Sequence, residues 1–283
     1  MAAPEEIRLR TPDGVDLAVY RYGGSGRPVL LGHPTGFNGR VWDPVAAALV
    51  GRGHAVWSYD HRGHGHSERG PSPEWSGYAT DLLAVVDHLE LDPDALIGAG
   101  LSMGGAAWIL AVARRPRLAR ALWLYEPIVF PPEIVLPPDQ EVPLAPMARK
   151  RRNAWESPQV ALESYRSRPP MQPFHPDALA GYVAAGLHED ANGVWRLTCD
   201  PMVESDSYNH GMHTGAWDLL PLVEPSTVVV SGSRSDALQP AWVRRLADRL
   251  PHGQHVVWDG AGHFGPLVDP DRAAAEIAAL SSS

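Results

Sequence analysis

The sequence has little of what marks secreted or membrane-spanning proteins. Cys199 is the only cysteine in 283 residues, which excludes a disulfide within the chain and favours a reducing compartment. No apolar run approaches the length of a transmembrane helix. The first six residues are acidic and lack the apolar core of a signal peptide. These absences predict a cytoplasmic protein that does not associate with membranes.

Positive charge is also scarce. The chain has 24 Lys and Arg against 33 Asp and Glu, a formal net charge of −9, and Lys150 is its only lysine. Proteins that bind nucleic acids present a basic stripe or patch to the phosphates. The one local basic cluster, residues 149–152, is better interpreted as the solvated face of a helix. We therefore expect no nucleic-acid partner.

Apolar residues make up 44% of the sequence, enough for a large core, and the length fits one α/β domain with an insertion. Short apolar runs alternate with segments of helical period. Such alternation is typical of a mostly parallel sheet with helices on both faces. The expected strands are residues 7–11, 16–22, 28–32, 55–59, 95–99, 121–125, 227–230 and 255–258. The expected helices are residues 42–50, 78–91, 105–115, 241–250 and 271–280.

The alternation stops after residue 126. Residues 127–215 are rich in Pro, Arg and Trp and lack strand-like runs. Three short helices are expected there, over residues 146–155, 158–166 and 176–186, each opened by a proline. The sequence thus predicts a core of residues 1–126 and 216–283, interrupted by a helical insertion over 127–215.

Residues 100–104, Gly-Leu-Ser-Met-Gly, form the most informative motif of the chain. The pattern G-x-S-x-G is typical of a nucleophile elbow, a sharp turn that exposes a serine hydroxyl between a strand and a helix. An apolar run over 95–99 precedes it, and an Ala-rich helical stretch over 105–115 follows it. We predict Ser102 as a nucleophile. The alternative is a serine that caps the helix of an ordinary tight turn.

A nucleophilic serine needs a histidine base, and the base needs a carboxylate to hold its tautomer. His263 lies in a Gly-rich loop after the last expected strand and is the predicted base. Asp236, just past the preceding strand, is the first choice for the carboxylate. Glu126 also follows a strand end and is the alternative, although we expect it to line the pocket or to serve as a structural carboxylate instead.

The oxyanion of an acyl-transfer intermediate needs two backbone N–H donors. Met103, directly after the nucleophile, is expected to supply one. The loop over residues 33–37 is expected to supply the other. Pro34 has no N–H, so Thr35 is the predicted donor. His33 is expected to brace this loop by hydrogen bonding rather than to act as a second base.

Residues 60–67, Asp-His-Arg-Gly-His-Gly-His-Ser, hold three histidines. Histidines this close together can also bind a metal ion, but no cysteine or carboxylate cluster completes a ligand set. The glycine spacing favours a turn packed near the 33–37 loop. The sequence also lacks the Gly-rich motifs that bind nucleotides. We expect neither a metal nor a cofactor.

Taken together, these motifs resemble those of the α/β-hydrolase family. The landmarks, in the order of the family, are His33-Pro34-Thr35-Gly36, Asp60-x-Arg62-Gly63-x-Gly65-x-Ser67, Gly100-x-Ser102-x-Gly104, Asp236 and His263. The resemblance implies a doubly wound, mostly parallel eight-stranded sheet with a helical cap inserted after strand six, which matches residues 127–215. Pro34 departs from the commoner motif, which has glycine after the histidine.

The resemblance implies an enzyme but leaves its substrate open, because this fold carries many activities. A serine nucleophile argues against the dehalogenases and epoxide hydrolases of the family, which use aspartate. The leading hypothesis is a serine hydrolase that cleaves a small, largely apolar ester, lactone or thioester through an acyl-enzyme on Ser102. The alternatives are a hydrolase of carbon–carbon bonds in β-diketone-like compounds, an acyltransferase or cyclase, and a non-catalytic receptor.

The expected partner is therefore a small molecule held beneath the cap. Phe37 and Phe264 neighbour the oxyanion loop and the base, and together with Glu126 they are expected to line its pocket. The sequence does not decide the oligomeric state, and a homodimer stays open.

Overall fold

Eight strands form one sheet in the order β1-β2-β4-β3-β5-β6-β9-β10. We analysed a computed structural model, which describes residues 3–70, 75–134, 136–137 and 140–282. β2 pairs antiparallel with β1 and β4, and the remaining neighbours are parallel. The predicted mostly parallel eight-stranded sheet is confirmed. The strands are β1 (Glu5–Arg10), β2 (Asp16–Gly23), β3 (Pro28–Gly32), β4 (Ala55–Tyr59), β5 (Ile97–Leu101), β6 (Ala121–Tyr125), β9 (Ser226–Gly232) and β10 (Gly253–Trp258).

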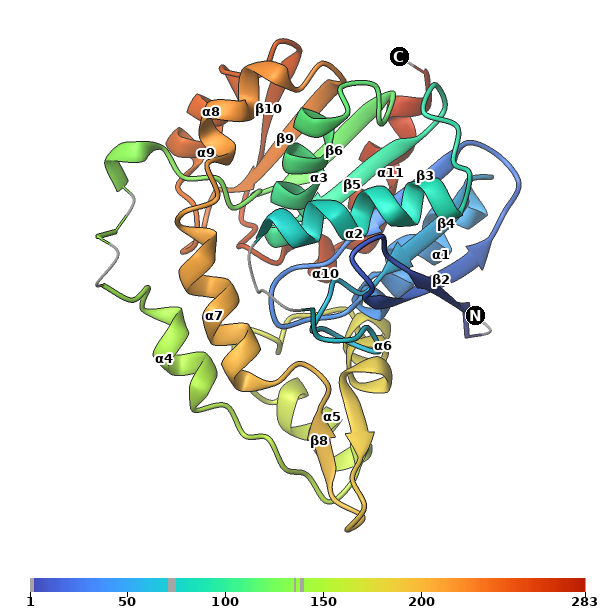
Figure 1. Ribbon diagram of the computed structural model, residues 1–283, viewed down its shortest axis with the longest axis vertical. Coiled ribbons are helices and arrows are strands. Elements are labelled where there is room, and N and C mark those ends of the chain that lie inside the picture. The colour runs from blue at the N-terminus through green and yellow to red at the C-terminus, as the bar shows by residue number, and fades with distance from the viewer. Residues whose placement is uncertain (1–2, 71–74, 135, 138–139, 283) are drawn as a thin grey trace.

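Helices cover both faces of this sheet (Figure 1). α1 (Asp43–Gly51) packs with α11 (Pro270–Ala279), and α2 (Trp75–His88) packs with α3 (Met103–Arg114). β5 and β6 lie between these layers and are buried along their whole length. That burial explains why their sequences are continuously apolar rather than alternating. The remaining core helices are α8 (Ala216–Leu219), α9 (Pro240–Ala247) and α10 (Gly265–Val268), with the short 3₁₀ turns η1 (Gly39–Trp42), η3 (Leu220–Leu222) and η4 (Leu280–Ser282).

Residues 127–215 leave the sheet after β6 and return at α8, and we call them the cap segment (Figure 1). They hold η2 (Pro132–Ile134), α4 (Leu144–Arg149), α5 (Pro158–Arg166), α6 (Pro176–Gly186) and α7 (Pro201–Gly211). The expectation of no strands here is wrong, because β7 (Leu187–Glu189) and β8 (Trp195–Leu197) form an antiparallel hairpin. Three-residue strands are too short to leave a period-two pattern. α7 was not predicted, because its sequence lacks an apolar helical period.

The turn from β5 to α3 is as crowded as the G-x-S-x-G motif predicts. A Cβ on Gly100 would lie 2.5 Å from the carbonyl carbon of Gly104, and one on Gly104 would lie 2.2 Å from the carbonyl oxygen of Gly32. Ser102 adopts φ +57° and ψ −117°, outside the ordinary regions for an L-residue. Such backbone strain clusters at functional sites.

Candidate active site

Ser102 stands at the carboxyl end of β5, in the middle of the sheet. Its N–H donates to the carbonyl of Tyr125 (2.9 Å), and its own carbonyl accepts the N–H groups of Ala106 (3.1 Å) and Ile128 (3.2 Å). The residue is 6% exposed. The elbow is therefore fixed on one side by its own helix and on the other by the chain that leaves β6.

Glu126 and His263 meet at the same end of the sheet. Oε2 of Glu126 lies 2.6 Å from Nδ1 of His263. The same Oε2 accepts the Ser235 hydroxyl at 2.6 Å, while Oε1 accepts the Gly232 N–H at 2.8 Å. Glu126 is 0% exposed, and its N–H donates to Val230. Charge-assisted bonds of this kind hold both the carboxylate and the imidazole ring in place.

The preference for Asp236 over Glu126 as the partner of His263 is wrong. Asp236 is exposed, whereas the preceding Ser235 turns inward and donates to Glu126. Of the two other roles expected for Glu126, the lining of a pocket is wrong, because its carboxylate is fully buried among protein donors. The loop after β9 therefore supports the carboxylate rather than supplying it.

The loop after β3 forms a tight turn beside the elbow. The Phe37 N–H donates to the Pro34 carbonyl (3.2 Å), and Gly36 adopts φ +77°. Thr35 lies inside this turn and is buried. Met103 is the first residue of α3, and N–H groups in a first helical turn have no intrahelical partner. We call residues 34–37 the oxyanion turn; its donor role is a proposal taken up below.

His33 braces this turn, as predicted. Its Nδ1 lies 2.8 Å from the Pro34 carbonyl oxygen, and its Nε2 accepts the N–H of His61 at 3.0 Å. These contacts require a neutral ring with the proton on Nδ1, and burial lowers the pKa of His33 well below its usual value. Residues 60–67 thus form a turn packed against the oxyanion turn, which is the predicted arrangement.

His61 and His64 complete a buried histidine cluster behind His33. The ring centroids of His33 lie 4.7 Å from those of His61 and 5.2 Å from those of His64. Within the residues that the structure describes, no group of three or more His, Cys, Asp or Glu is placed to hold a metal ion. Burial lowers the pKa of His64 to about 4, so the cluster is neutral at pH 7.

This cluster predicts a pH-dependent loss of stability. The pKa of His64 is about 4 in the folded chain, against the ordinary histidine value of 6.5 in the unfolded chain. The unfolded chain therefore binds more protons below pH 6.5. Its share of the stability is therefore lost as pH falls through that window. Between pH 7 and pH 5 the wild type should lose about 2 kcal/mol more than His64→Asn. Urea unfolding of both proteins at the two pH values measures the difference.

The comparison between variants isolates His64 from groups of opposite effect. Burial raises the pKa of Asp60 and of Asp81 to about 6, so these carboxyls favour the folded chain as pH falls. They contribute equally to both proteins. Equal losses in the wild type and His64→Asn would contradict the assignment of a depressed pKa to His64.

An aromatic group lies beside His263. The ring of Phe264 lies 5.0 Å from that of His263 and 5.3 Å from that of Phe37. Phe174 and Tyr182 of the cap segment pack on Phe37 at 6.0 Å and 4.9 Å. The structure thus brings together Phe37 and Phe264, as the sequence predicted, and places the cap segment directly above them. Two methionines of the cap segment, Met147 and Met202, are exposed.

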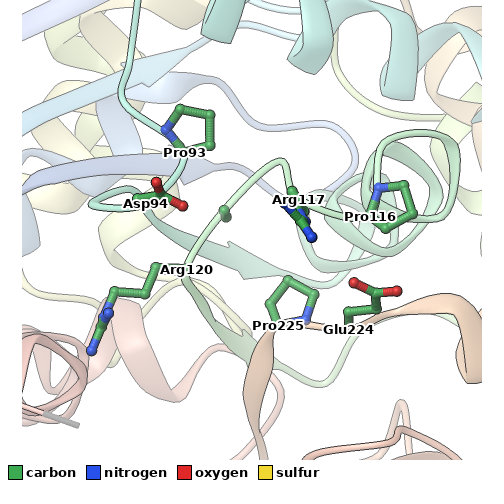
Figure 2. A pocket seen from close by; sticks show the side chains of 8 residues that line it. Pro93, Asp94, Pro116, Arg117, Arg120, Glu224 and Pro225 are labelled. Carbon is green, nitrogen blue, oxygen red and sulfur yellow. The ribbon is translucent and has the colours of Figure 1, made fainter.

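A surface cavity of about 380 Å³ lies far from these residues (Figure 2). Its lining comes from segments just before β5, β6 and β9, whereas Ser102 and Glu126 follow the ends of β5 and β6. The cavity therefore opens at the amino ends of these strands, opposite the end that carries Ser102 and Glu126. The lining residues are Pro93, Asp94, Pro116, Arg117, Ala119, Arg120, Glu224 and Pro225.

Known proteins place the chain in a family. The sequence model of the alpha/beta hydrolase family matches residues 29–277. The chain belongs to the alpha/beta hydrolase family. This confirms the resemblance inferred from the motifs, and with it the prediction of an enzyme of the hydrolase type. No helix in the described ranges is both long and apolar enough to cross a membrane.

Individual members of the alpha/beta hydrolase family resemble this chain over most of its length. It is 26% identical to the non-heme chloroperoxidase CPO-A1 of Kitasatospora aureofaciens, covering 93% of this chain and 94% of that one. It is also 26% identical to the esterase Rv0045c of Mycobacterium tuberculosis, covering 92% and 84%. The crystal structure of E-2-(acetamidomethylene)succinate hydrolase superposes with a TM-score of 0.79 at 22% identity, covering 99% and 100%. At this identity, the similarity to that structure supports the fold and not the activity.

Proposed function

We propose that this family member is a serine hydrolase that cleaves a small carboxylic ester, lactone or thioester through an acyl-enzyme on Ser102. The observation that carries the proposal is the 2.6 Å contact between Glu126 and His263 beside a strained serine elbow. A fully buried carboxylate on Nδ1 leaves Nε2 as the atom that can accept a proton. The esterase among its relatives supports this class.

In this mechanism His263 takes the proton from the Ser102 hydroxyl as the oxygen attacks the substrate carbonyl. The N–H groups of Met103 and Thr35 stabilise the resulting oxyanion. His263 then protonates the leaving group, and the same imidazole activates the water that releases the acyl group. Glu126 keeps the proton of neutral His263 on Nδ1 and stabilises the imidazolium that forms.

The proposed partner is a small molecule held between the oxyanion turn and the cap segment, in a reducing compartment such as the cytoplasm. The closeness of Phe37, Phe174 and Phe264 favours an apolar portion of the substrate near the base. A relative named as a chloroperoxidase points to a second candidate activity, halogenation with halide as the reductant and hydrogen peroxide as the oxidant. An assay of halogenation by the wild type with halide and hydrogen peroxide tests this second candidate.

Intact-mass measurement after treatment with a small fluorophosphonate tests the proposal. The wild type should gain one adduct, because an activated serine displaces fluoride and keeps the phosphonyl group. Ser102→Ala should gain none, and a panel of esters, lactones and thioesters should be hydrolysed by the wild type alone. An adduct that persists in Ser102→Ala, or no adduct on the wild type, would contradict the assignment.

A further inference from the structure

A buried ion pair lies in the cap segment, outside the residues used so far. Arg151 follows α4, and its Nη1 contacts Oε2 of Glu204 on α7. Its Nη2 donates to the hydroxyl of Tyr182 on α6 (2.6 Å). Glu204 is 5% exposed. Holding two opposite charges in such a place is costly, and the gain in stability over apolar residues is small. Stability alone therefore does not account for the pair.

The pair sits against the oxyanion turn. A Cβ on Gly36 would lie 2.5 Å from Oε1 of Glu204, so the carboxylate packs directly on the backbone of this turn. Tyr182, which accepts the bond from Arg151, also packs its ring on Phe37. Two independent contacts thus place the guanidinium one side-chain layer from the oxyanion turn.

The guanidinium keeps unused donors and remains accessible. Arg has five N–H donors, and the bonds to Glu204 and Tyr182 occupy two of them. The Arg151 side chain is 20% exposed. Within the described residues its Nε and Nη atoms are not among the buried atoms that lack a partner. The remaining donors are therefore available to a ligand beside the contacts with Glu204 and Tyr182.

We propose that Arg151 binds a neutral oxygen of the substrate, a ketone or hydroxyl carried by the acyl chain at a distance from the scissile carbonyl. Glu204 sets the charge preference, because the pair is neutral as a whole and a substrate carboxylate would meet a second carboxylate there. Tyr182 fixes the guanidinium plane. This inference rests on the proposed hydrolase function and adds an acyl-chain specificity to it.

Paired substrates test the proposal. They are p-nitrophenyl esters of straight-chain acids of five to seven carbons and of the same acids with a ketone at the penultimate carbon. At one chain length the wild type should prefer the keto ester by roughly 10- to 100-fold in kcat/KM, the range of a hydrogen bond from a charged donor. Half-esters of the matching dicarboxylic acids should be poorer than the keto esters. A preference for the half-esters would overturn the choice of a neutral oxygen.

Variants assign the preference to Arg151. Arg151→Met alone would strand Glu204, so the test uses Arg151→Met combined with Glu204→Gln. In this double variant the ratio of kcat/KM for keto and plain esters should fall to about one. The single variant Arg151→Lys, which keeps a positive charge, should retain part of the preference for keto esters. Lys150→Met, next in sequence and exposed, should keep the wild-type ratio. A double variant that also keeps the ratio would overturn the proposal.

The readouts separate this inference from the proposed function. Plain esters hydrolysed without any preference for keto esters would overturn the role of Arg151 and leave the hydrolase assignment standing. If the wild type hydrolyses no ester, the hydrolase assignment fails. Calorimetry on Ser102→Ala then still tests binding, since the free keto acid should bind at least 10-fold more tightly than the plain acid. Equal binding would overturn the inference by itself.

Discussion

Glu126→Gln should lower kcat/KM for a simple ester by about 10³- to 10⁴-fold, the loss expected when a triad histidine is held in the wrong tautomer. The Gly232 N–H, 2.8 Å from Oε1, keeps the amide oxygen at that position. The amide nitrogen then faces Nδ1 of His263 and donates to it. The ring is left with its proton on Nε2, where it cannot accept the proton of Ser102. Steady-state kinetics on an ester hydrolysed by the wild type measures the loss.

Asp236→Asn is the matched control for this experiment. Asp236 has the same charge and lies one residue from Ser235, which donates to Glu126, but it is exposed. Its kcat/KM should stay within about threefold of the wild type, since surface substitutions have small effects. The reverse outcome, with Asp236→Asn inactive and Glu126→Gln active, would restore Asp236 as the acid of the triad.

Gly104→Ala should cost the chain several kcal/mol of unfolding free energy, about 3 kcal/mol or more, or prevent folding. The added methyl carbon would lie 2.2 Å from the Gly32 carbonyl oxygen. That oxygen belongs to the backbone of β3, which cannot move aside as a flexible side chain can. α3 would have to separate from β3 and carry the elbow with it. Denaturant unfolding followed by circular dichroism gives the change in free energy.

Gly51→Ala makes the same substitution at the end of α1, where a Cβ would meet nothing within 4 Å. Its unfolding free energy should be unchanged or higher by up to about 1 kcal/mol, because alanine reduces the freedom of the unfolded chain. A Gly104→Ala protein as stable as Gly51→Ala would mean that the strand and helix do not meet as closely as described.

The sequence was sufficient for the parts of the site that depend on local backbone geometry. Ser102 lies in a turn that only a particular glycine spacing permits, so the pattern itself predicts its position. His263 follows the last strand in a glycine-rich loop, which narrows the choice to one histidine. The sheet followed from the alternation of short apolar runs with helices. The nucleophile elbow and the loop of His263 are each encoded by neighbouring residues, whereas the sheet is encoded by the alternation along the chain.

The carboxylate could not be chosen in the same way. Glu126 and Asp236 both follow strand ends at one edge of the sheet, and both have the required chemistry. The decision depends on whether Ser235 or Asp236 turns inward, which is a matter of tertiary packing. The interpretation of residues 149–152 as the solvated face of a helix is wrong for Arg151, which follows the end of α4 and pairs with Glu204. The members of this pair are 53 residues apart and join separate elements of the cap segment.

The position of Glu126 has a consequence for exchanging caps between relatives. The carboxylate that contacts His263 is the last residue before the cap segment begins, and Ile128, two residues later, still donates to the Ser102 carbonyl (3.2 Å). A chimera joined at residue 126 or 127 would therefore disturb His263 and Ser102 together. A junction placed after Val129 leaves both contacts in the recipient, so a new specificity could be grafted without rebuilding the catalytic residues.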